Sequence, residues 1–356
     1  MNARFAGVLL ILLVALGGGA LLIREQQASR QPTGKGTLGQ PLLKDLQAAQ
    51  VTSIVIREPK AAITIAKKDE GWTIAERGGF PADVEKVRDF VVKAIALKVG
   101  QIEPIGEKDR ARLLLDAGGT AIEFLGAEGK PLAKLTAGKK YFKNEPENPE
   151  KANGDGRYVA LPGDEKRVVV VSDPLLLAST RSADWISKAG FAAEKVKVME
   201  VRFADGTGWK IERSGDNADW KLAGARGDEK LEITSANSAS YSLSLIELAD
   251  VAPANLKPEE TGLDKPTLVT ATTLEGLSYT LKVGKLSGDS YYASVAIAGT
   301  PKPEGKDAEE RLKKINERLP REKALAAYTL LISKSKLDDV LKKRVELLVK
   351  KEEKKK

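Results

Sequence analysis

The chain has 356 residues, of which 30% are charged and 5% are aromatic, and it contains neither Cys nor His. This length suits two domains with mainly aliphatic cores, and the missing residue types exclude thiol chemistry, disulfides, Cys/His zinc sites and the usual general base of a serine hydrolase. The net charge of +8 lies almost wholly in residues 302–356, where 18 Lys and Arg stand against 11 Asp and Glu. No stacking aromatics are interleaved with these charges, so we expect a solvated basic tail and no nucleic-acid partner.

Residues 1–23 are predicted to form a membrane anchor. The run Phe5–Ile23 carries no charge and, at about 1.5 Å per residue, just spans a hydrocarbon core of about 30 Å. A cleaved signal peptide is the alternative, because Gly18-Gly19-Ala20 resembles a cleavage site. The apolar Leu21-Leu22-Ile23 that follow favour the anchor. We therefore expect contact with the lipid bilayer through residues 5–23.

The orientation of the anchor rests on two opposing signals. Arg24, Arg30 and Lys35 follow the span whereas Arg4 precedes it, which mildly favours the body inside. A very short N-terminal tail is typical of a signal anchor, and large domains translocate largely regardless of charge. We expect a single-pass protein of the inner (cytoplasmic) membrane whose body faces the periplasm or the cell exterior. Residues 24–50 are predicted to be a polar linker.

Residues 51–190 are predicted to form one α+β unit that begins with a β-meander. Short alternating runs at 51–57, 63–68 and 72–75 are typical of half-buried strands. A helix should follow from Pro81-Ala82-Asp83, because apolar residues then recur at helical spacing. Further strands are expected at 120–125, 132–137, 158–161 and 168–171, and a helix capped by Ser172-Asp173-Pro174 should run to about Ile186.

Residues 196–349 repeat this order, so the predicted fold is α+β with two tandem copies of a β-meander plus helix unit, preceded by one transmembrane helix. In the second copy Ser235 should cap a helix that presents Tyr241, Leu245 and Leu248 on one face. An inserted polar segment, 301–321, is predicted to be a short exposed helix that stops near Pro320. Residues 350–356 form a basic tail.

The motifs of the second copy resemble the domain of unknown function 4340 family. They are Gly262-Leu263-Asp264-Lys265-Pro266, Val283-Gly284-Lys285 and the strands that carry Trp. The first copy keeps Leu115-Asp116 but lacks the Pro. The resemblance implies a bacterial envelope protein with one N-terminal span, encoded near an ATP-binding-cassette transporter and its gliding-motility-type auxiliary protein. It supplies no catalytic residues.

Four kinds of residue are candidates for a site, and each has a structural interpretation that we favour. Gly-Lys pairs at 34, 129, 138, 284 and 305 do not complete a phosphate loop and are expected in hairpin turns and loops. The acidic loop 145–155 lacks EF-hand spacing. Trp72, Trp209 and Trp220 could stack on sugars but suit core packing better. The carboxylate pairs Asp338-Asp339 and Glu259-Glu260 stand in charged surroundings. No catalytic, cofactor-binding or metal-binding residue is assigned.

Three classes of function remain. The favoured hypothesis is a non-catalytic, membrane-anchored adaptor or accessory subunit whose partners are other envelope or membrane proteins, in a transporter-like complex. The alternatives are a carboxylate-based hydrolase of cell-wall glycan and a membrane-surface protein that binds anionic lipid through its basic C-terminal tail. No enzyme activity and no cofactor are expected under the favoured hypothesis.

Overall fold

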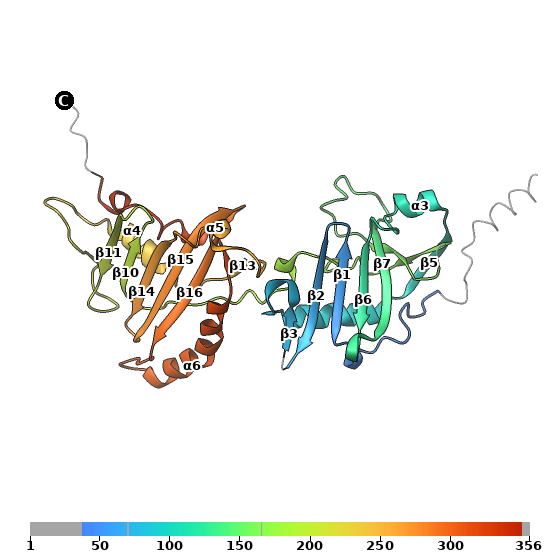
Figure 1. Ribbon diagram of the computed structural model, residues 1–356, viewed down its shortest axis with the longest axis horizontal. Coiled ribbons are helices and arrows are strands. Elements are labelled where there is room, and N and C mark those ends of the chain that lie inside the picture. Colours follow the sequence, from blue (N-terminus) through green and yellow to red (C-terminus); the bar gives the residue numbers. More distant parts are fainter. Residues whose placement is uncertain (1–37, 70, 165, 351–356) are drawn as a thin grey trace, which may run out of the picture. The chain divides into compact units, whose positions relative to one another are not determined.

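The computed structural model describes residues 38–69, 71–164 and 166–350 (Figure 1). The predicted anchor at 5–23, most of the predicted linker and residues 351–356 of the predicted tail lie outside the described residues. Within the described part, no helix is both long enough and apolar enough to cross a membrane.

The described residues form an α+β fold built on two large antiparallel sheets, which confirms the predicted fold class at this level. The described residues divide into two compact units. One unit holds residues 38–62 together with Arg88–Thr180, and the other holds Ile63–Val87 and residues 181–350.

The first sheet has the strand order β4-β3-β2-β1-β6-β7-β8-β9-β5. Its strands are β1 (Ser53–Glu58), β2 (Ala61–Lys68), β3 (Gly71–Ile74), β4 (Phe80–Pro81), β5 (Val99–Pro104), β6 (Thr120–Leu125), β7 (Pro131–Tyr141), β8 (Gly156–Ala160) and β9 (Arg167–Val171). Helix α2 (Val84–Ala96) lies between β4 and β5, and α3 (Glu107–Arg112) lies between β5 and β6.

The second sheet has the strand order β12-β11-β10-β14-β15-β16-β17-β13. Its strands are β10 (Val196–Arg202), β11 (Gly208–Glu212), β12 (Lys221–Leu222), β13 (Leu248–Val251), β14 (Thr267–Thr273), β15 (Leu277–Ser287), β16 (Ser290–Gly299) and β17 (Leu330–Ser333). The helices are α4 (Ile233–Tyr241), α5 (Pro258–Thr261), α6 (Ala308–Ala324) and α7 (Lys334–Leu337).

Apart from β4, the two sheets have one order of strands. Taken in chain order, the strands β1, β2, β3, β5, β6, β7, β8 and β9 occupy the same places in the first sheet as β10 to β17 occupy in the second. In both sheets the first strand pairs antiparallel with the strand that follows the second helix, β1 with β6 and β10 with β14. In each sheet, strands from later in the chain therefore continue the sheet beside the first strand of the meander.

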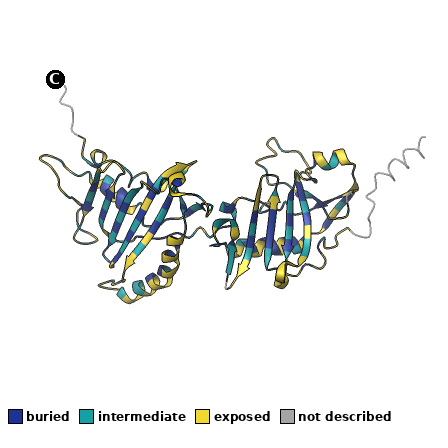
Figure 2. Ribbon diagram, in the orientation of Figure 1, coloured by how far each residue is buried: buried dark blue, intermediate teal, exposed yellow. Residues whose placement is uncertain are grey.

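The cores lie on one face of each sheet, because alternate strand residues point to that face. In β6 every second residue is buried, and Figure 2 shows the buried positions alternating along the central strands. Helix α2 contributes Val87, Phe90, Val91 and Ala94 to the core, and the Phe90 ring stacks on Phe124 of β6 with 5.9 Å between ring centroids. The predicted helical spacing after Pro81 is thus realised as a buried apolar face.

In each unit, a short segment that precedes the first strand forms backbone hydrogen bonds with the residues at or just before the strand that follows the first helix. We call it the lead-in segment. In the first unit the Leu42 N–H donates to the Leu97 carbonyl and the Val99 N–H donates to the Gln40 carbonyl. In the second unit Leu248 N–H donates to the Lys188 carbonyl and Ile246 N–H to the Phe191 carbonyl. Residues 38–50 of the predicted linker are therefore described as part of the fold, with Leu43 and Leu46 buried.

The helix predicted from Ser172 to Ile186 does not form. The Asp173 carboxylate accepts the Leu175 N–H at 2.7 Å, and Leu175 has a φ of +50°, which a right-handed helix cannot contain. The described segment has only a 3-10 turn at Ser182–Asp184. A side chain that satisfies a nearby backbone N–H competes with helix formation, and the sequence pattern alone did not reveal this competition.

The predictions for α4 and α6 also differ from the structure. Glu232, and not Ser235, caps α4 by accepting the N–H groups of Thr234 and Ser235. Helix α6 does not stop near Pro320: it continues through this residue to Ala324, and it buries Ile315, Leu319 and Glu322. One face of α6 is therefore buried against the second unit, whereas the sequence predicted an exposed helix.

Candidate functional site

The residues of the family motif meet at a joint between helix and strand. Gly262 follows α5 with a φ of +74°, and the Leu263 N–H donates to the Pro258 carbonyl at 2.9 Å. This is the bond pattern of a Schellman helix end, which favours Gly at the left-handed position. A Cβ on Gly284 would lie 2.2 Å from the Thr261 carbonyl oxygen. Glycine at 284 therefore allows the helix end to pack directly on β15.

The first unit has the same joint. The Leu115 N–H donates to the Arg110 carbonyl at 2.8 Å, and Leu114 takes the left-handed position with a φ of +55°. A Cβ on Gly138 of β7 would lie 2.3 Å from the Leu113 carbonyl oxygen. The pairing register shifts in both sheets at this glycine, which marks a β-bulge. These motifs therefore have a structural role, because their glycines allow a helix end to pack on a strand.

The prediction that the Gly-Lys pairs lie in turns and loops was wrong for two of them. Gly138-Lys139 and Gly284-Lys285 lie inside β7 and β15, at the bulges. Gly129-Lys130 closes a turn and Gly305-Lys306 precedes α6. The pair at 34–35 lies outside the described residues.

Two of the three predicted tryptophans belong to the core. Trp209 and Trp220 are 3% and 5% exposed, and their indole N–H groups donate to the Lys342 carbonyl and to Asn237 Oδ1. Trp72 is half-buried. Trp185, which the sequence patterns did not single out, is fully buried. Trp209 and Trp220 are therefore not accessible for stacking on a sugar.

Candidate acidic side chains in the loop and in both carboxylate pairs bind groups that are near them in the sequence. In the loop 145–155, Asp155 accepts the Lys143 N–H at 2.9 Å. Glu260 accepts the Lys257 N–H, and Asp339 pairs with Lys342 at 2.6 Å. Among the described residues there is no cluster of three acidic side chains that could hold a metal ion.

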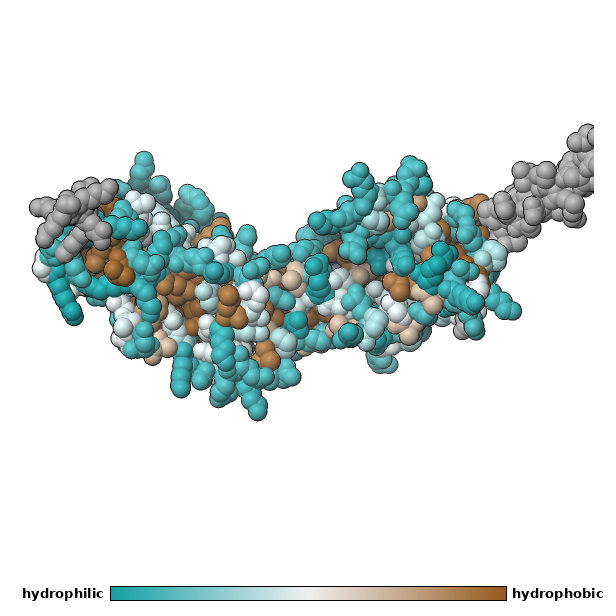
Figure 3. Space-filling view, turned by 90° about the horizontal axis from the view of Figure 1, so that it is seen from above, coloured by the Kyte–Doolittle hydropathy of each residue, from teal (hydrophilic) through white to brown (hydrophobic). Residues whose placement is uncertain are grey.

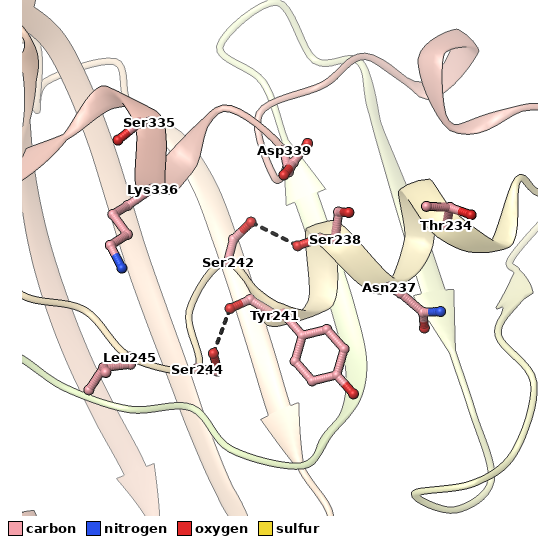
Figure 4. Close-up of a pocket in the computed structure, with 10 residues that line it drawn as sticks. All are labelled: Thr234, Asn237, Ser238, Tyr241, Ser242, Ser244, Leu245, Ser335, Lys336 and Asp339. Carbon is pink, nitrogen blue, oxygen red and sulfur yellow. Dashed lines mark hydrogen bonds between the residues drawn. The ribbon is translucent and has the colours of Figure 1, made fainter.

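A surface cavity of about 440 Å³ lies between α4 and α7 (Figure 4). Tyr241 and Leu245 line it while remaining 64% and 61% exposed. The other lining residues are polar: Thr234, Asn237, Ser238, Ser242, Ser244, Ser335, Lys336 and Asp339. The sequence predicted that Tyr241 and Leu245 share a face with Leu248, but Leu248 is buried whereas these two face solvent.

Helix α4 forms despite its many serines because its ends and its inner face are well satisfied. Ala236 and Ala239 are buried. The carboxylate of Glu232 accepts N–H groups of the first turn, mainly that of Ser235, and these hydrogen bonds lower its pKa. Asn237 is fixed by the indole N–H of buried Trp220 at 3.0 Å. The cavity wall is therefore attached to the core.

A second cavity of about 530 Å³ shares Leu245 with the first, and the two form one surface region that we call the α4–α6 groove. Its lining includes Lys188, Glu247, Lys314, Arg318, Arg321 and Glu322. Glu322 is 1% exposed. It accepts hydrogen bonds from Arg318 Nη1 at 3.1 Å, from the Ala192 N–H at 3.2 Å and from the Tyr279 hydroxyl at 3.2 Å.

Burial shifts the pKa values of two groups in this cluster. It raises the pKa of Glu322, although the Arg318 guanidinium acts in the opposite direction. It also raises the pKa of Tyr279, with the Glu322 charge as a further cause. Arg318 also donates to the Ala192 carbonyl at 2.9 Å and to Glu194 at 3.0 Å. The cluster anchors α6 to the segment at 192–194.

The groove offers apolar contact and hydrogen bonding. The hydroxyl groups of Ser242 and Ser244 donate to the carbonyl groups of Ser238 and Tyr241 (Figure 4). Neither serine is therefore directed at a base that could activate it. Sequence reasoning missed this region because its residues come from four separated stretches, 188–194, 234–247, 314–322 and 335–339. The available signal was the helical spacing of Tyr241 and Leu245, which does not distinguish a buried face from an exposed one.

A family model described as "Domain of unknown function (DUF4340)" matches residues 72–266, more than half of the chain. The chain belongs to this family, as its motifs predicted. No curated protein and no solved structure is significantly similar to the chain.

Proposed function

We propose that this protein is a non-catalytic adaptor or accessory subunit of an envelope complex. Residues 5–23 anchor it in the inner membrane, and its body faces the periplasm or the cell exterior. Its α4–α6 groove binds a segment of another membrane or envelope protein. The family resemblance suggests a complex of the ATP-binding-cassette transporter type.

The exposure of Tyr241 and Leu245 carries this proposal. Both side chains are more than 60% exposed on a groove wall whose helix is tied to the core. Exposed apolar side chains with a polar rim are typical of protein interaction sites. A Tyr at such a position presents a large contact area at a low entropic cost. The membrane anchor adds to binding by raising the effective concentration of the groove near integral-membrane partners.

We further propose that the body arose as two tandem copies of one unit. The shared strand order, the paired lead-in segments and the matching joints at Gly138 and Gly284 support this interpretation. The copies differ in one wall of the groove: α6 lies between β16 and β17, whereas no helix lies between β8 and β9 among the described residues. The insertion therefore gives the second copy a surface of its own.

Photocrosslinking in intact membranes tests the adaptor proposal. A photoreactive amino acid at position 241 or 245 should give adducts with a membrane or envelope protein that mass spectrometry identifies. The same amino acid at Leu286, which is 48% exposed on β15, is the matched control. Adducts equally strong from position 286, or none from 241 and 245, would refute the groove as the binding site. Hydrolysis of cell-wall glycan by the purified protein would favour the hydrolase alternative.

A further inference from the structure

An apolar patch is exposed at the C-terminal end of the described chain. Val345 is 72% exposed, Val349 is 50% exposed and Ile233 is 44% exposed. Backbone pairing brings them together, since Val349 N–H donates to the Lys230 carbonyl and Glu232 N–H donates to the Leu347 carbonyl. Figure 3 shows apolar atoms at the surface beside the grey residues at one end of the molecule. We call these three residues the C-terminal patch.

The patch is held in place by buried and paired neighbours. Leu347 is fully buried, and Arg344 pairs with Glu229 at 2.7 Å. The segment is thus fixed on its inner side while Val345 and Val349 point outward. Neither valine fills the core, so both aliphatic side chains, together with Ile233, are available for contact with another surface.

Positive charge is concentrated in the sequence of residues 342–356. Residues 342–356 contain eight Lys and Arg against three Glu. Lys342, Lys343 and Arg344 are neutralised by Asp339, Asp205 and Glu229 within the fold. The excess therefore comes from Lys350 and the lysines that follow it in the sequence.

We propose that the C-terminal patch docks on the surface of an anionic lipid bilayer. The aliphatic side chains would enter the boundary between headgroups and acyl chains, while the lysines bind lipid phosphates. Charge complementarity favours this occupant over an apolar protein surface, which offers no counterpart for the lysines. The absence of aromatic residues from 342–356 argues against single-stranded nucleic acid. This contact is separate from the groove and does not depend on the adaptor function.

Site-specific labelling of the full chain tests the proposal. The natural chain has no Cys, so Val345→Cys provides a unique attachment point for an environment-sensitive dye. The labelled protein is reconstituted in vesicles of phosphatidylcholine with about one-third phosphatidylglycerol, and in phosphatidylcholine alone. We expect a blue shift and about twofold or greater quenching by spin-labelled lipid in the anionic vesicles, with little change in the neutral ones.

Two controls give the experiment its specificity. Leu286→Cys, exposed to 48% on β15, should show no lipid-dependent change. Replacement of Lys350 and the later lysines by Gln, or addition of high salt, should remove most of the effect at position 345. The proposal is overturned if the dye at 345 behaves alike in anionic and neutral vesicles, or if position 286 responds equally. Val349→Cys serves as the second labelling site if the first variant folds poorly.

Discussion

At the residue scale, Glu322 of α6 accepts hydrogen bonds from three donors: the Tyr279 hydroxyl of β15, the Ala192 N–H in the segment before β10, and Arg318 of the same helix. Glu322→Ala removes the acceptor of the Tyr279 hydroxyl and of the Ala192 N–H, and it leaves Arg318 with Glu194 as its remaining carboxylate partner. We expect the free energy of unfolding to fall by about 2–3 kcal/mol, because buried polar groups lose their partner. Chemical denaturation measures this loss.

Glu194→Gln is the matched control. Glu194 contacts the same Arg318 at 3.0 Å but its side chain is 57% exposed. Removal of its charge should cost no more than about 1 kcal/mol. Equal losses for the two variants would contradict the role given to burial.

The same residue predicts a pH dependence of stability. Burial raises the folded-state pKa of Glu322 above its ordinary value of 4.5. As the pH rises, the unfolded chain therefore releases this proton first, and the contribution of Glu322 to stability falls from pH 4.5 up to the folded-state pKa. The stability of the wild type relative to Glu322→Gln should decline over that window in denaturation experiments. A pH-independent difference would show that the carboxyl is not perturbed.

At the element scale, the two helix-to-strand joints require glycine. Gly284→Ala and Gly138→Ala place a Cβ 2.2 Å and 2.3 Å from a carbonyl oxygen. Each should lose about 2 kcal/mol of unfolding free energy because the backbone must shift. Gly215→Ala, where a Cβ meets nothing within 4 Å, should stay within about 0.5 kcal/mol of the wild type. Similar losses at all three positions would argue against the joint.

Leu114 occupies in the first joint the left-handed position that Gly262 occupies in the second. Since Leu114 is 39% exposed, Leu114→Gly should relieve more strain than the burial and entropy it loses, and raise the unfolding free energy by about 0.5 kcal/mol. Leu176→Gly, at a leucine that is 50% exposed and has no positive φ, should instead be destabilising. Thermal unfolding of the two variants in parallel gives the comparison.

At the scale of the whole molecule, the proposed topology leaves the body accessible from outside the cytoplasmic membrane. Protease added to spheroplasts should degrade residues 38–350 without permeabilisation, because the single span at 5–23 would leave all later residues on the outer face. A cytoplasmic marker protein should survive in the same sample. Full protection of the body would reverse the predicted orientation.

Much of the local structure followed from the sequence alone. Alternation of apolar and polar residues predicted the meanders near 51–75 and the strands near 120–137 and 267–283, because a strand with one buried face must alternate. Helical spacing after Pro81 predicted α2 for the same kind of reason. The motifs at 262–266 and 283–285 predicted the family.

Only the tertiary structure decided which faces are covered and which residues meet. Tyr241 and Leu245 have a spacing that suits burial, yet both are exposed, whereas Glu322 on a polar helix is buried and bonded to Tyr279 and Ala192. The pairing of β9 with β5 and the meeting of Gly284 with Thr261 join residues distant in the chain. Periodicity determines which side chains share a face, but the burial of that face depends on long-range packing, which a local pattern does not contain.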